Sequence, residues 1–404
     1  MLNFIALKGI SLYNITMAYT LYLKKGEEKR ILAGHSWVYA NEVQKIEGKD
    51  RNGSLATVCA WDGKFLGKGY INHLSKIIVR IFIREDIQDT KELFLERLTR
   101  ANESRKALGY DDSYRVCFAE ADDLPALIVD KYADVLSVQF LSLGMEKRKD
   151  LITECLVEIF NPKGIYERSD VAVRLKEGLQ EVKGVLYGEV PDRVIINENG
   201  IKIAVDVKGG QKTGYFLDQK ENRLASRKYC KGKTVLDCFS NTGGFSLNTA
   251  TVAKEVTAVD ISPTAIASVN ENKELNGFTN LNAVCANVFD ILREYREQGK
   301  TFGTVILDPP AFTKSVAEIK DAIRGYTDIN VLGLKLVEKG GYLISSSCSH
   351  YVSQQAFEKM LIDSARIAKR RVKCIEIKSQ APDHPYLLCA EETSYLKFFV
   401  LQVD

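Results

Sequence analysis

The stretch from Thr234 to Asp260 (TVLDCFSNTGGFSLNTATVAKEVTAVD) constrains the fold of this chain more than any other part of it. The apolar run from Thr234 to Phe239 predicts a buried parallel strand. The turn at 240–244 contains Gly243, so the backbone can bend sharply there and approach a ligand. The helix that follows would present its N-terminal amides to that ligand. The strand 255–260 then ends in a carboxylate, and the whole stretch predicts an α/β fold.

The spacing of two acidic residues suggests that the ligand contains a nucleoside. Asp260 lies 23 positions after Asp237, near the spacing at which an acidic residue meets the ribose in nucleotide-binding α/β folds. The dinucleotide fingerprint G-x-G-x-x-G is absent, because Phe239 and Asn241 stand where its first two glycines would be. A glycine turn alone is also compatible with a purely structural role.

Two later strand ends strengthen the functional interpretation. The sequence Asp-Pro-Pro-Ala-Phe at 308–312 follows a predicted strand at 303–307, and Ser-Ser-Cys-Ser at 346–349 follows one at 341–345. Polar residues at three strand ends fit a single crevice at the carboxyl edge of a parallel sheet.

Composition excludes several classes of protein. The chain has 404 residues, 45% hydrophobic and 27% charged residues and a net charge of +3, which indicates a globular protein of two or three domains. No apolar run is long enough to span a bilayer. The nine cysteines include no C-x-x-C pair, so neither a metal site nor a disulfide framework is expected. Cys59, Cys238, Cys285 and Cys374 lie in predicted strands, where we expect buried thiols, and free thiols suggest a reducing cytoplasm.

The first part of the chain divides into an N-terminal extension, residues 1–17, and a β-rich domain, residues 18–90. The extension is a poor signal peptide, and we interpret it as an extension or a misassigned start, with an added edge strand as the alternative. In the second segment, Asp62-Gly63 predicts a hairpin, and 77–83 is a β-branched run. This segment resembles a PUA domain, a compact RNA-binding module. Its basic and aromatic residues either contact RNA or form a solvated face beside core aromatics.

A linker helix and a small α+β domain are predicted for residues 91–199. The helix at 87–108 has one apolar stripe, and strands are expected at 126–130, 135–141, 164–169 and 184–189, with a helix near 145–160. Arg168 and Asp170 at a strand end could touch substrate, although an ion pair that supports the fold is the simpler role.

Residues 200–404 form the predicted C-terminal domain. Strand 201–207 alternates like an antiparallel strand, and Ser262 with Pro263 predicts a helix start. Further strands are expected at 281–287, 303–307 and 341–345, followed by a hairpin of 372–378 and 395–403. A parallel sheet that ends in an antiparallel hairpin is typical of class I, Rossmann-like methyltransferases.

The motifs together resemble a specific family. D-x-F-x-x-T-G-G-F, the acidic strand end, D-P-P-A-F and S-C-S are similar to the PUA-containing cytosine-carbon-5 methyltransferases of bacterial large-subunit ribosomal RNA. K-T-G-Y-F-L-D-Q at 212–219 and D-H-P at 383–385 also match, and the resemblance runs from about residue 18 to the C-terminus. It implies S-adenosylmethionine (SAM) as methyl donor, ribosomal RNA as substrate, a cytoplasmic location and commonly a homodimer.

The resemblance also implies roles for particular residues. Cys348 and Asp308 would be catalytic. Substrate would meet Pro309, Pro310, Phe312, Lys24 and Lys25. Position 287 is Asn where the family often has an acidic residue, but an amide can still bond the adenine amino group. The cofactor would be held by Tyr215, Phe216, Gln219, Asp237, Phe239, Thr242, Gly243, Asp260, Asn287 and Asp308.

The implied chemistry explains these residue types. Carbon 5 of cytosine is a poor nucleophile, and a thiolate that adds to carbon 6 activates it. Cys348 would supply the thiolate, and Asp308 would hold the N3 edge. A paired base must first be flipped out of its helix. Ala311 stands where a related class of cytosine enzymes has a second cysteine, so one cysteine is implied. His384 and Glu391 are the two candidates for the base that removes the carbon-5 proton.

Two alternatives stay open at this point. A methyltransferase of the same fold could act on a guanine or adenine nitrogen, where D-P-P motifs also occur, but it would not need Cys348. A non-catalytic RNA-binding protein with a vestigial methyltransferase domain is the second alternative. The intact Asp237, Gly243, Asp260 and Asp308 count against it, and a SAM-binding measurement would separate the two.

Overall fold

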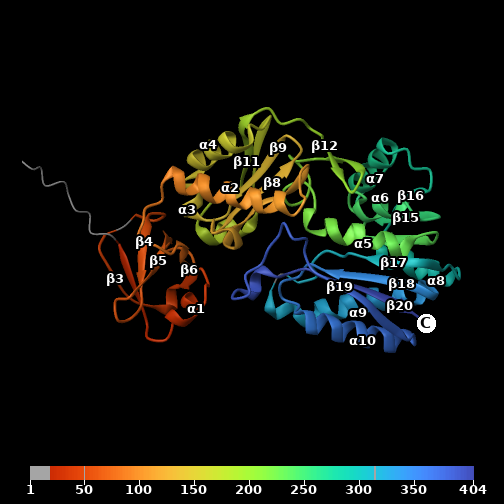
Figure 1. The fold of residues 1–404 in the computed structure, drawn as a ribbon. Helices are drawn as coiled ribbons and strands as arrows, with labels where there is room; N and C mark the ends of the chain where they lie inside the picture. Colours follow the sequence, from red (N-terminus) through yellow and green to blue (C-terminus); the bar gives the residue numbers. More distant parts are fainter. Residues whose placement is uncertain (1–18, 50, 314) are drawn as a thin grey trace, which may run out of the picture.

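The computed structural model describes residues 19–49, 51–313 and 315–404, and the predicted extension at 1–17 lies outside these ranges. In chain order, the described strands form a six-stranded sheet, a five-stranded sheet, a two-stranded hairpin and a seven-stranded sheet (Figure 1). Across the described ranges, we find no helix with the length and apolarity needed to cross a membrane. The predicted fold class, a β-rich N-terminal part, an α+β middle and a C-terminal α/β sheet, is confirmed.

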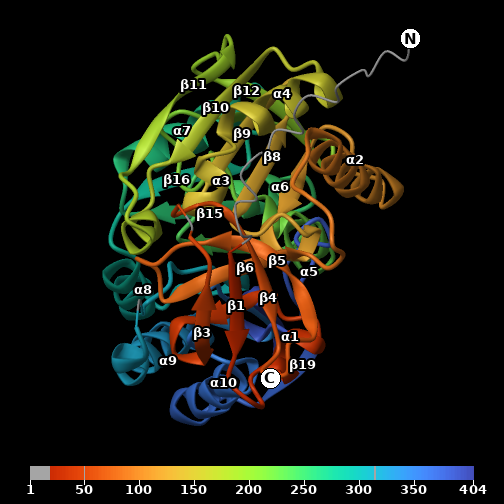
Figure 2. The same cartoon turned by 90° about the vertical axis from the view of Figure 1, so that its left-hand side faces the viewer.

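The six-stranded sheet has the order β2-β6-β5-β4-β1-β3. Figure 2 labels five of its strands, β1, β3, β4, β5 and β6. Its hairpin of β4 and β5 turns at Asp62-Gly63 as predicted, with Gly63 at φ +89°. The apolar side chains of β1, β4 and β6 and Ile31 of helix α1 (Glu28–Leu32) form a separate small core. The strands are β1 (Thr20–Leu23), β2 (Trp37–Tyr39), β3 (Val43–Glu47), β4 (Leu55–Cys59), β5 (Phe65–Ile71) and β6 (Ile77–Ile83).

The five-stranded sheet follows helix α2 (Lys91–Ala107), which packs its predicted apolar stripe inward. Its order is β11-β10-β9-β8-β7, and the helix α4 (Lys149–Phe160) connects the parallel strands β9 and β10. Arg168 pairs with Asp170 at 3.0 Å and donates to two backbone carbonyls, so this pair supports the fold. The strands are β7 (Ser113–Phe118), β8 (Leu127–Tyr132), β9 (Val135–Phe140), β10 (Gly164–Ser169) and β11 (Val182–Gly188).

Glu177 joins the first two sheets. Its carboxylate is buried and accepts hydrogen bonds from Asn72 at 2.9 Å and Ser75 at 2.6 Å, and it pairs with Arg80 at 3.1 Å. Arg80 lies in β6, and Asn72 and Ser75 lie in the loop between β5 and β6, while Glu177 precedes β11. These hydrogen bonds and this ion pair of a buried carboxylate hold the first sheet against the middle of the chain.

The predicted antiparallel strand at 201–207 is confirmed as β13 (Ile201–Val205), and its partner is β12 (Val194–Glu198). The two strands turn through Asn199-Gly200, where both residues have positive φ. The domain boundary predicted at 199/200 coincides with this turn, and the domain boundaries stay predictions.

The seven-stranded sheet has the order β16-β15-β14-β17-β18-β20-β19. The strand β20 runs opposite to the other six strands of this sheet and forms an antiparallel hairpin with β19. The predicted parallel sheet with a terminal hairpin is confirmed. Chain order reverses direction at β14, which puts a switch point between β14 and β17. The strands are β14 (Thr234–Cys238), β15 (Glu255–Asp260), β16 (Leu281–Cys285), β17 (Phe302–Leu307), β18 (Val337–Ser347), β19 (Val372–Lys378) and β20 (Lys397–Val403).

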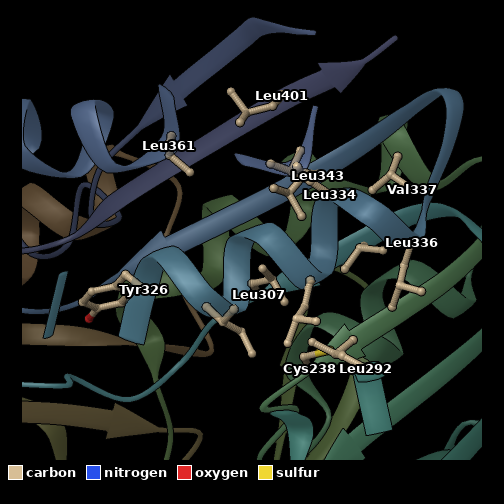
Figure 3. Packing of buried hydrophobic residues seen from close by; sticks show 14 of the residues in the cluster. Cys238, Leu292, Leu307, Tyr326, Leu334, Leu336, Val337, Leu343, Leu361 and Leu401 are labelled. Carbon is tan, nitrogen blue, oxygen red and sulfur yellow. The ribbon is translucent and has the colours of Figure 1, made fainter. Parts of the chain in front are cut away.

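Helices cover both faces of this sheet. One face packs against α8 (Val288–Glu297), α9 (Ile319–Leu336) and α10 (Gln354–Ala368), and Figure 3 shows part of that core, with Leu307 and Leu343 facing Leu334. The other face packs against α5 (Lys220–Cys230), α6 (Gly244–Ala250) and α7 (Pro263–Leu275). Ser262 caps α7 with Pro263 at its first turn, as predicted.

The expectation for the four strand cysteines is half right. Cys59 and Cys238 are buried, as predicted, but Cys285 and Cys374 are exposed. The reason is that Cys285 ends β16 and Cys374 lies in β19, and these are the two edge strands of the seven-stranded sheet. A strand pattern in the sequence does not distinguish an edge from the centre of a sheet.

Candidate functional site

Three strand ends meet at the carboxyl edge of the seven-stranded sheet. Cys238 of β14 pairs with Leu307 of β17, and Leu307 pairs with Ser345 of β18. The polar residues that end or follow these strands therefore share one edge, as predicted. We name Asp237, Asp308 and Cys348, one from each strand end, the strand-end site.

The glycine turn after β14 has a strained backbone. Phe239 and Asn241 have φ of +64° and +49°, a region that non-glycine residues rarely occupy, and Gly243 has φ +87°. A Cβ on Gly243 would lie 3.3 Å from Val269, so glycine keeps the turn close to α7. Asp260 holds this turn, because its carboxylate accepts the backbone N–H of Asn241 at 2.9 Å. Strain of this kind is typical of binding sites.

Asp237 has an oxygen without a partner. Ser246 donates to its Oδ2 at 2.5 Å, while Oδ1 has no hydrogen-bond partner among the described residues, although the side chain is only 1% exposed. Burial raises the pKa of Asp237 to about 7, with a further contribution from the charge of Asp308. A buried acceptor without a donor is costly, so this oxygen is suited to the cationic or N–H group of a ligand.

Asp308 follows β17 and is half-buried. Gln219 donates to its Oδ1 at 2.9 Å, and Asn222 in turn donates to the side-chain oxygen of Gln219 at 2.7 Å. Burial raises the pKa of Asp308 to about 6, and the charge of Asp218 adds to this shift. Asp308 can therefore carry a proton close to neutral pH.

Cys348 directly follows β18 and is half-buried. Burial raises the pKa of its thiol. The charges of Asp308 and Asp218 add to that shift, while Lys212 and Lys397 oppose it. The thiol thus lies among two carboxylates and two ammonium groups that come from three separate segments of the chain.

The segment 212–219 contributes residues of different kinds. Tyr215 is buried, and its hydroxyl donates to Glu198 at 3.3 Å, so it contributes to the core. Phe216 is half-buried under the Lys212 ammonium, which lies 4.4 Å from the ring centre. Thr242 in the glycine turn is half-buried, and its carbonyl accepts from Asn272 at 3.1 Å.

Asn287 caps a helix, and this changes its predicted contact. Its Oδ1 accepts the backbone N–H of Phe289 at 2.9 Å and of Asp290 at 3.4 Å, at the start of α8. The oxygen that was predicted to meet the adenine amino group is thus already engaged. The side chain is exposed, and its NH2 group is the part that can donate to a ligand.

The residues predicted for substrate lie in two places. Pro309 is buried, Pro310 is exposed, and Phe312 is half-buried with its ring 4.7 Å from that of Tyr326. Lys24 and Lys25 are exposed on the first sheet, where Lys24 donates to the Asn41 carbonyl at 2.8 Å. No contact joins these two lysines to the strand-end site in the described part of the chain.

The aromatic residues of the first sheet differ in availability. The indole N–H of Trp37 donates to Glu120 at 2.7 Å, and Arg80 lies over its ring, so the Trp37 ring is engaged in packing. Trp61 was not selected from the sequence, although it is 46% exposed and Lys25 lies 5.0 Å from its ring centre. The sequence signal that could have identified Trp61 is its place directly before the predicted hairpin turn at Asp62-Gly63.

The two candidates for a proton-removing base differ in their surroundings. His384 is buried, and its Nδ1 lies 2.7 Å from Asp383, whose other oxygen accepts the backbone N–H of Arg115. Glu391 is exposed.

Sequence reasoning missed Asp218, whose Oδ2 accepts from Tyr395 at 2.5 Å and from Lys212 at 2.9 Å, while its Oδ1 has no partner among the described residues.

Comparisons with known proteins identify the family of this chain. A PUA-like domain family matches residues 21–84, and an S-adenosylmethionine-dependent methyltransferase family matches residues 179–393. A protein named ribosomal RNA large subunit methyltransferase I from Aeromonas salmonicida is 44% identical over 96% of this chain and all of its own length. The protein of that name from Vibrio cholerae is 43% identical over the same shares.

Solved structures show the same fold. A Streptococcus mutans protein assigned as a SAM-dependent methyltransferase superposes with a TM-score of 0.81 at 23% identity, over 95% of this chain and 99% of its own. A methyltransferase structure complexed with SAH superposes with a TM-score of 0.82, with the same identity and coverage.

Proposed function

Because the chain belongs to the ribosomal RNA large subunit methyltransferase I family, whose methyltransferase domain uses SAM, we propose that it forms 5-methylcytidine in large-subunit ribosomal RNA. The observation that carries this proposal is the position of the Cys348 thiol on the strand end next to Asp308, at the carboxyl edge of the sheet. Nucleoside mass spectrometry of ribosomal RNA from a strain without the gene tests it. Loss of a 5-methylcytidine from the large subunit is expected, and loss of a methylated guanine or adenine instead would contradict it.

Several side chains fit SAM. The partnerless Oδ1 of Asp237 is suited to the ammonium of the methionine part, and Gly243 allows the backbone to approach the ligand. Asp260 is suited to the ribose hydroxyls, since a carboxylate oxygen that accepts one N–H can accept a second donor. Ile261, which is 65% exposed beside Asp260, offers an apolar surface to the adenine ring, and the Asn287 NH2 group can donate to a ring nitrogen. SAM supplies an electrophilic methyl group.

The remaining steps rest on the chain itself. The Cys348 thiolate forms a bond to carbon 6 of cytosine, and the electron pair of the 5,6 double bond moves into the ring. Asp308, with its pKa raised to about 6, can share a proton with N3 as negative charge arrives there. After carbon 5 is methylated, loss of its proton restores the double bond and expels the thiolate. Proton sharing at N3 and the covalent bond together make carbon 5 nucleophilic.

The same geometry weighs against methylation of a ring or exocyclic nitrogen. Such a nitrogen already carries a reactive electron pair, so a thiol at the site would have no part in the reaction. Cys348 is half-buried at the edge of the site, where Lys212 and Lys397 favour its thiolate while burial, Asp308 and Asp218 oppose it. The presence of a half-buried thiol at this strand end is the feature that supports carbon-5 chemistry.

Replacing Asp260 by alanine should weaken SAM binding by about 1.5–3 kcal/mol, because hydrogen bonds to a charged acceptor are lost. The change also removes the acceptor that holds the Asn241 N–H, and part of the loss comes through the turn. Isothermal calorimetry measures the effect, with thermal unfolding as a check on folding. Asp192→Ala, at an exposed carboxylate, is the matched control. Unchanged SAM affinity in folded Asp260→Ala protein would remove Asp260 from the site.

We also propose that the first sheet binds RNA through Lys24 and Lys25 beside the exposed ring of Trp61. Log affinity should fall linearly with log salt, and the double variant Lys24→Ala/Lys25→Ala should reduce that slope by roughly 0.7–0.9 for each phosphate that is no longer neutralised. Fluorescence anisotropy with a ribosomal RNA fragment at several salt concentrations measures it. Lys335→Ala/Lys339→Ala, at exposed lysines beside the start of β18, serves as the control. Equal slopes for both double variants would assign the RNA-binding surface elsewhere.

The family relationship supports two further proposals, a homodimer and a cytoplasmic location. Light scattering on the purified chain measures the first, and a mass of one chain at micromolar concentration would contradict it. Fractionation of cells checks the second, and recovery of the protein with the membranes would oppose it.

A further inference from the structure

Lys397 is a buried lysine whose place in the fold is tied to Cys348. It is the first residue of β20, only 6% exposed, and it pairs in register with Ser347, the residue before Cys348. Its ammonium donates to the backbone carbonyl of Ser349, the residue after Cys348, at 2.5 Å. The side chain thus starts beside one neighbour of the cysteine and ends at the other, so it runs along Cys348.

Within the described ranges, the ammonium has one N–H donor without a partner. It gives one hydrogen bond to Ser349 and one to the Tyr395 carbonyl at 2.8 Å, and a lysine has three donors. No carboxylate lies within ion-pair distance of Lys397 among the described residues, whereas buried charges in proteins are normally paired. Burial accordingly lowers the pKa of Lys397 to about 8. In the described structure the Lys397 ammonium is therefore buried without an anionic partner, and the Cys348 thiol beside it would become such a partner when it ionises.

The other charged groups around Cys348 either have a carboxylate partner or destabilise its thiolate. Lys212 is paired with Asp218 at 2.9 Å, so its charge is largely balanced. Asp308 and Asp218 both disfavour a thiolate, and the phenols of Tyr326 and Tyr395 also interact with the sulfur. The imidazole of His350 lies near Lys397, and burial together with the charge of Lys397 lowers its pKa. Lys397 is therefore the cation near Cys348 whose charge is not offset by a carboxylate in the described part of the chain.

We propose that Lys397 is a positioning residue for the nucleophile: its ammonium holds the strand end around Cys348 in place and stabilises the Cys348 thiolate. This inference rests on the proposed role of Cys348 and adds the group that ionises it. Before RNA binds, the thiol proton leaves to solvent and the ammonium balances the resulting charge. When the sulfur bonds to carbon 6, that negative charge moves into the base.

Alkylation of Cys348 by iodoacetamide tests the proposal without RNA or SAM. The thiolate displaces iodide and the thiol does not, so the rate follows the ionised fraction, and mass spectrometry of peptides resolves each cysteine. The charge of Lys397 lowers the pKa of the Cys348 thiol, and an opposite charge close to an acid typically lowers its pKa by about 1–3 units. Lys397→Met should therefore slow alkylation of Cys348 at pH 7 by roughly 10-fold or more. The exposed Cys285 and Cys374 are internal references whose rates should not change.

Two further variants show whether the charge of Lys397 or its packing determines the alkylation rate of Cys348. Lys397→Arg retains a cation and should keep most of the alkylation rate, while Lys397→Gln retains donors without the charge and should behave like Lys397→Met. Lys397→Gln also provides the measurement if Lys397→Met does not fold. Lys68→Met is the matched control, because Lys68 is equally buried and donates to a carbonyl, but it pairs with Asp86 in the first sheet.

The pH dependence adds a measurement that a purely structural role would not change. The charge on Lys397 is present below its pKa of about 8 and is lost above it. The rates of wild type and Lys397→Met should therefore differ most near pH 7 and converge at higher pH. Equal rates in folded wild type, Lys397→Met and Lys397→Gln at pH 7 would overturn the proposal. An active Cys348→Ala enzyme would instead overturn the proposed function, so the two failures are distinguishable.

Discussion

Replacing Cys348 by alanine should abolish methyl transfer while leaving SAM binding intact. The thiol is the group that would bond to carbon 6, and without that bond carbon 5 stays a poor nucleophile, so the activity should fall below detection. The partnerless oxygen of Asp237 and the glycine turn, which we assign to SAM, lie at the end of β14, which β17 separates from β18, and should keep their geometry. Transfer of a radiolabelled methyl group to RNA, together with calorimetry of SAM binding, measures both properties.

A second cysteine provides the matched control. Cys389→Ala also removes a half-buried thiol, but from a loop outside the strand-end site, and this variant should keep its activity. Full activity of Cys348→Ala would reject the carbon-5 reaction and favour methylation of a guanine or adenine nitrogen.

Asp308→Asn should reduce the methylation rate by about 10²–10⁴-fold, the usual contribution of a positioned acid or base. The amide keeps the size of the carboxyl group and can still bond the N3 edge of the base, but it cannot transfer a proton. Single-turnover methylation measures the loss, and Asp192→Asn, at an exposed carboxylate, is the control. A loss of less than threefold would mean that Asp308 acts only as a hydrogen-bonding group.

The pH dependence separates these two roles. The active form needs a protonated Asp308 and an ionised Cys348, and burial raises both pKa values, that of Asp308 to about 6. Below this pH the rate at low RNA concentration should rise with pH, because the thiolate fraction grows. Above it the rate should be flat, because protonated Asp308 is lost as fast as thiolate is gained. In Asp308→Asn the rise should continue towards the pKa of the thiol.

The sequence predicted the C-terminal sheet well because its strands are short apolar runs with polar ends. The bounds of β15 and β19 agree with the prediction, and the parallel sheet with its terminal hairpin followed from the alternation of strands and helices. The strand β7 was missed. Its buried Arg115 interrupts the apolar pattern, and only the structure shows that Asp130 of β8 pairs with it at 2.7 Å.

The strand β12 was missed for a different reason, since its turn signal was present. Asn199-Gly200 is a strong hairpin signal between two alternating runs, and β12 pairs with the predicted strand across it. Reading the turn together with both of its flanks would have identified this strand from the sequence.

The polar surroundings of Cys348 were beyond sequence reasoning because they join distant segments. Tyr395 bonds Asp218 across 177 positions, and Lys397 reaches Ser349 across 48. The motifs identified the strand ends because each motif is local in the sequence. The charges that shift the pKa of Cys348 come from β20 and from the segment before α5. Asn287 shows the converse case, in which a local helix cap engages the oxygen that a motif assigns to a ligand.

The most direct test of the covalent mechanism is trapping with RNA that carries 5-fluorocytidine at the target position. Fluorine cannot leave carbon 5 as a cation, so the base should be methylated once and should then stay bonded to Cys348. Wild-type protein with SAM should give an RNA–protein band that survives denaturing electrophoresis, and mass spectrometry should locate the link at Cys348. Without SAM, or with Cys348→Ala, no stable band should form. Methylation of unsubstituted RNA without any trapped band, or a band linked to another residue, would contradict the account.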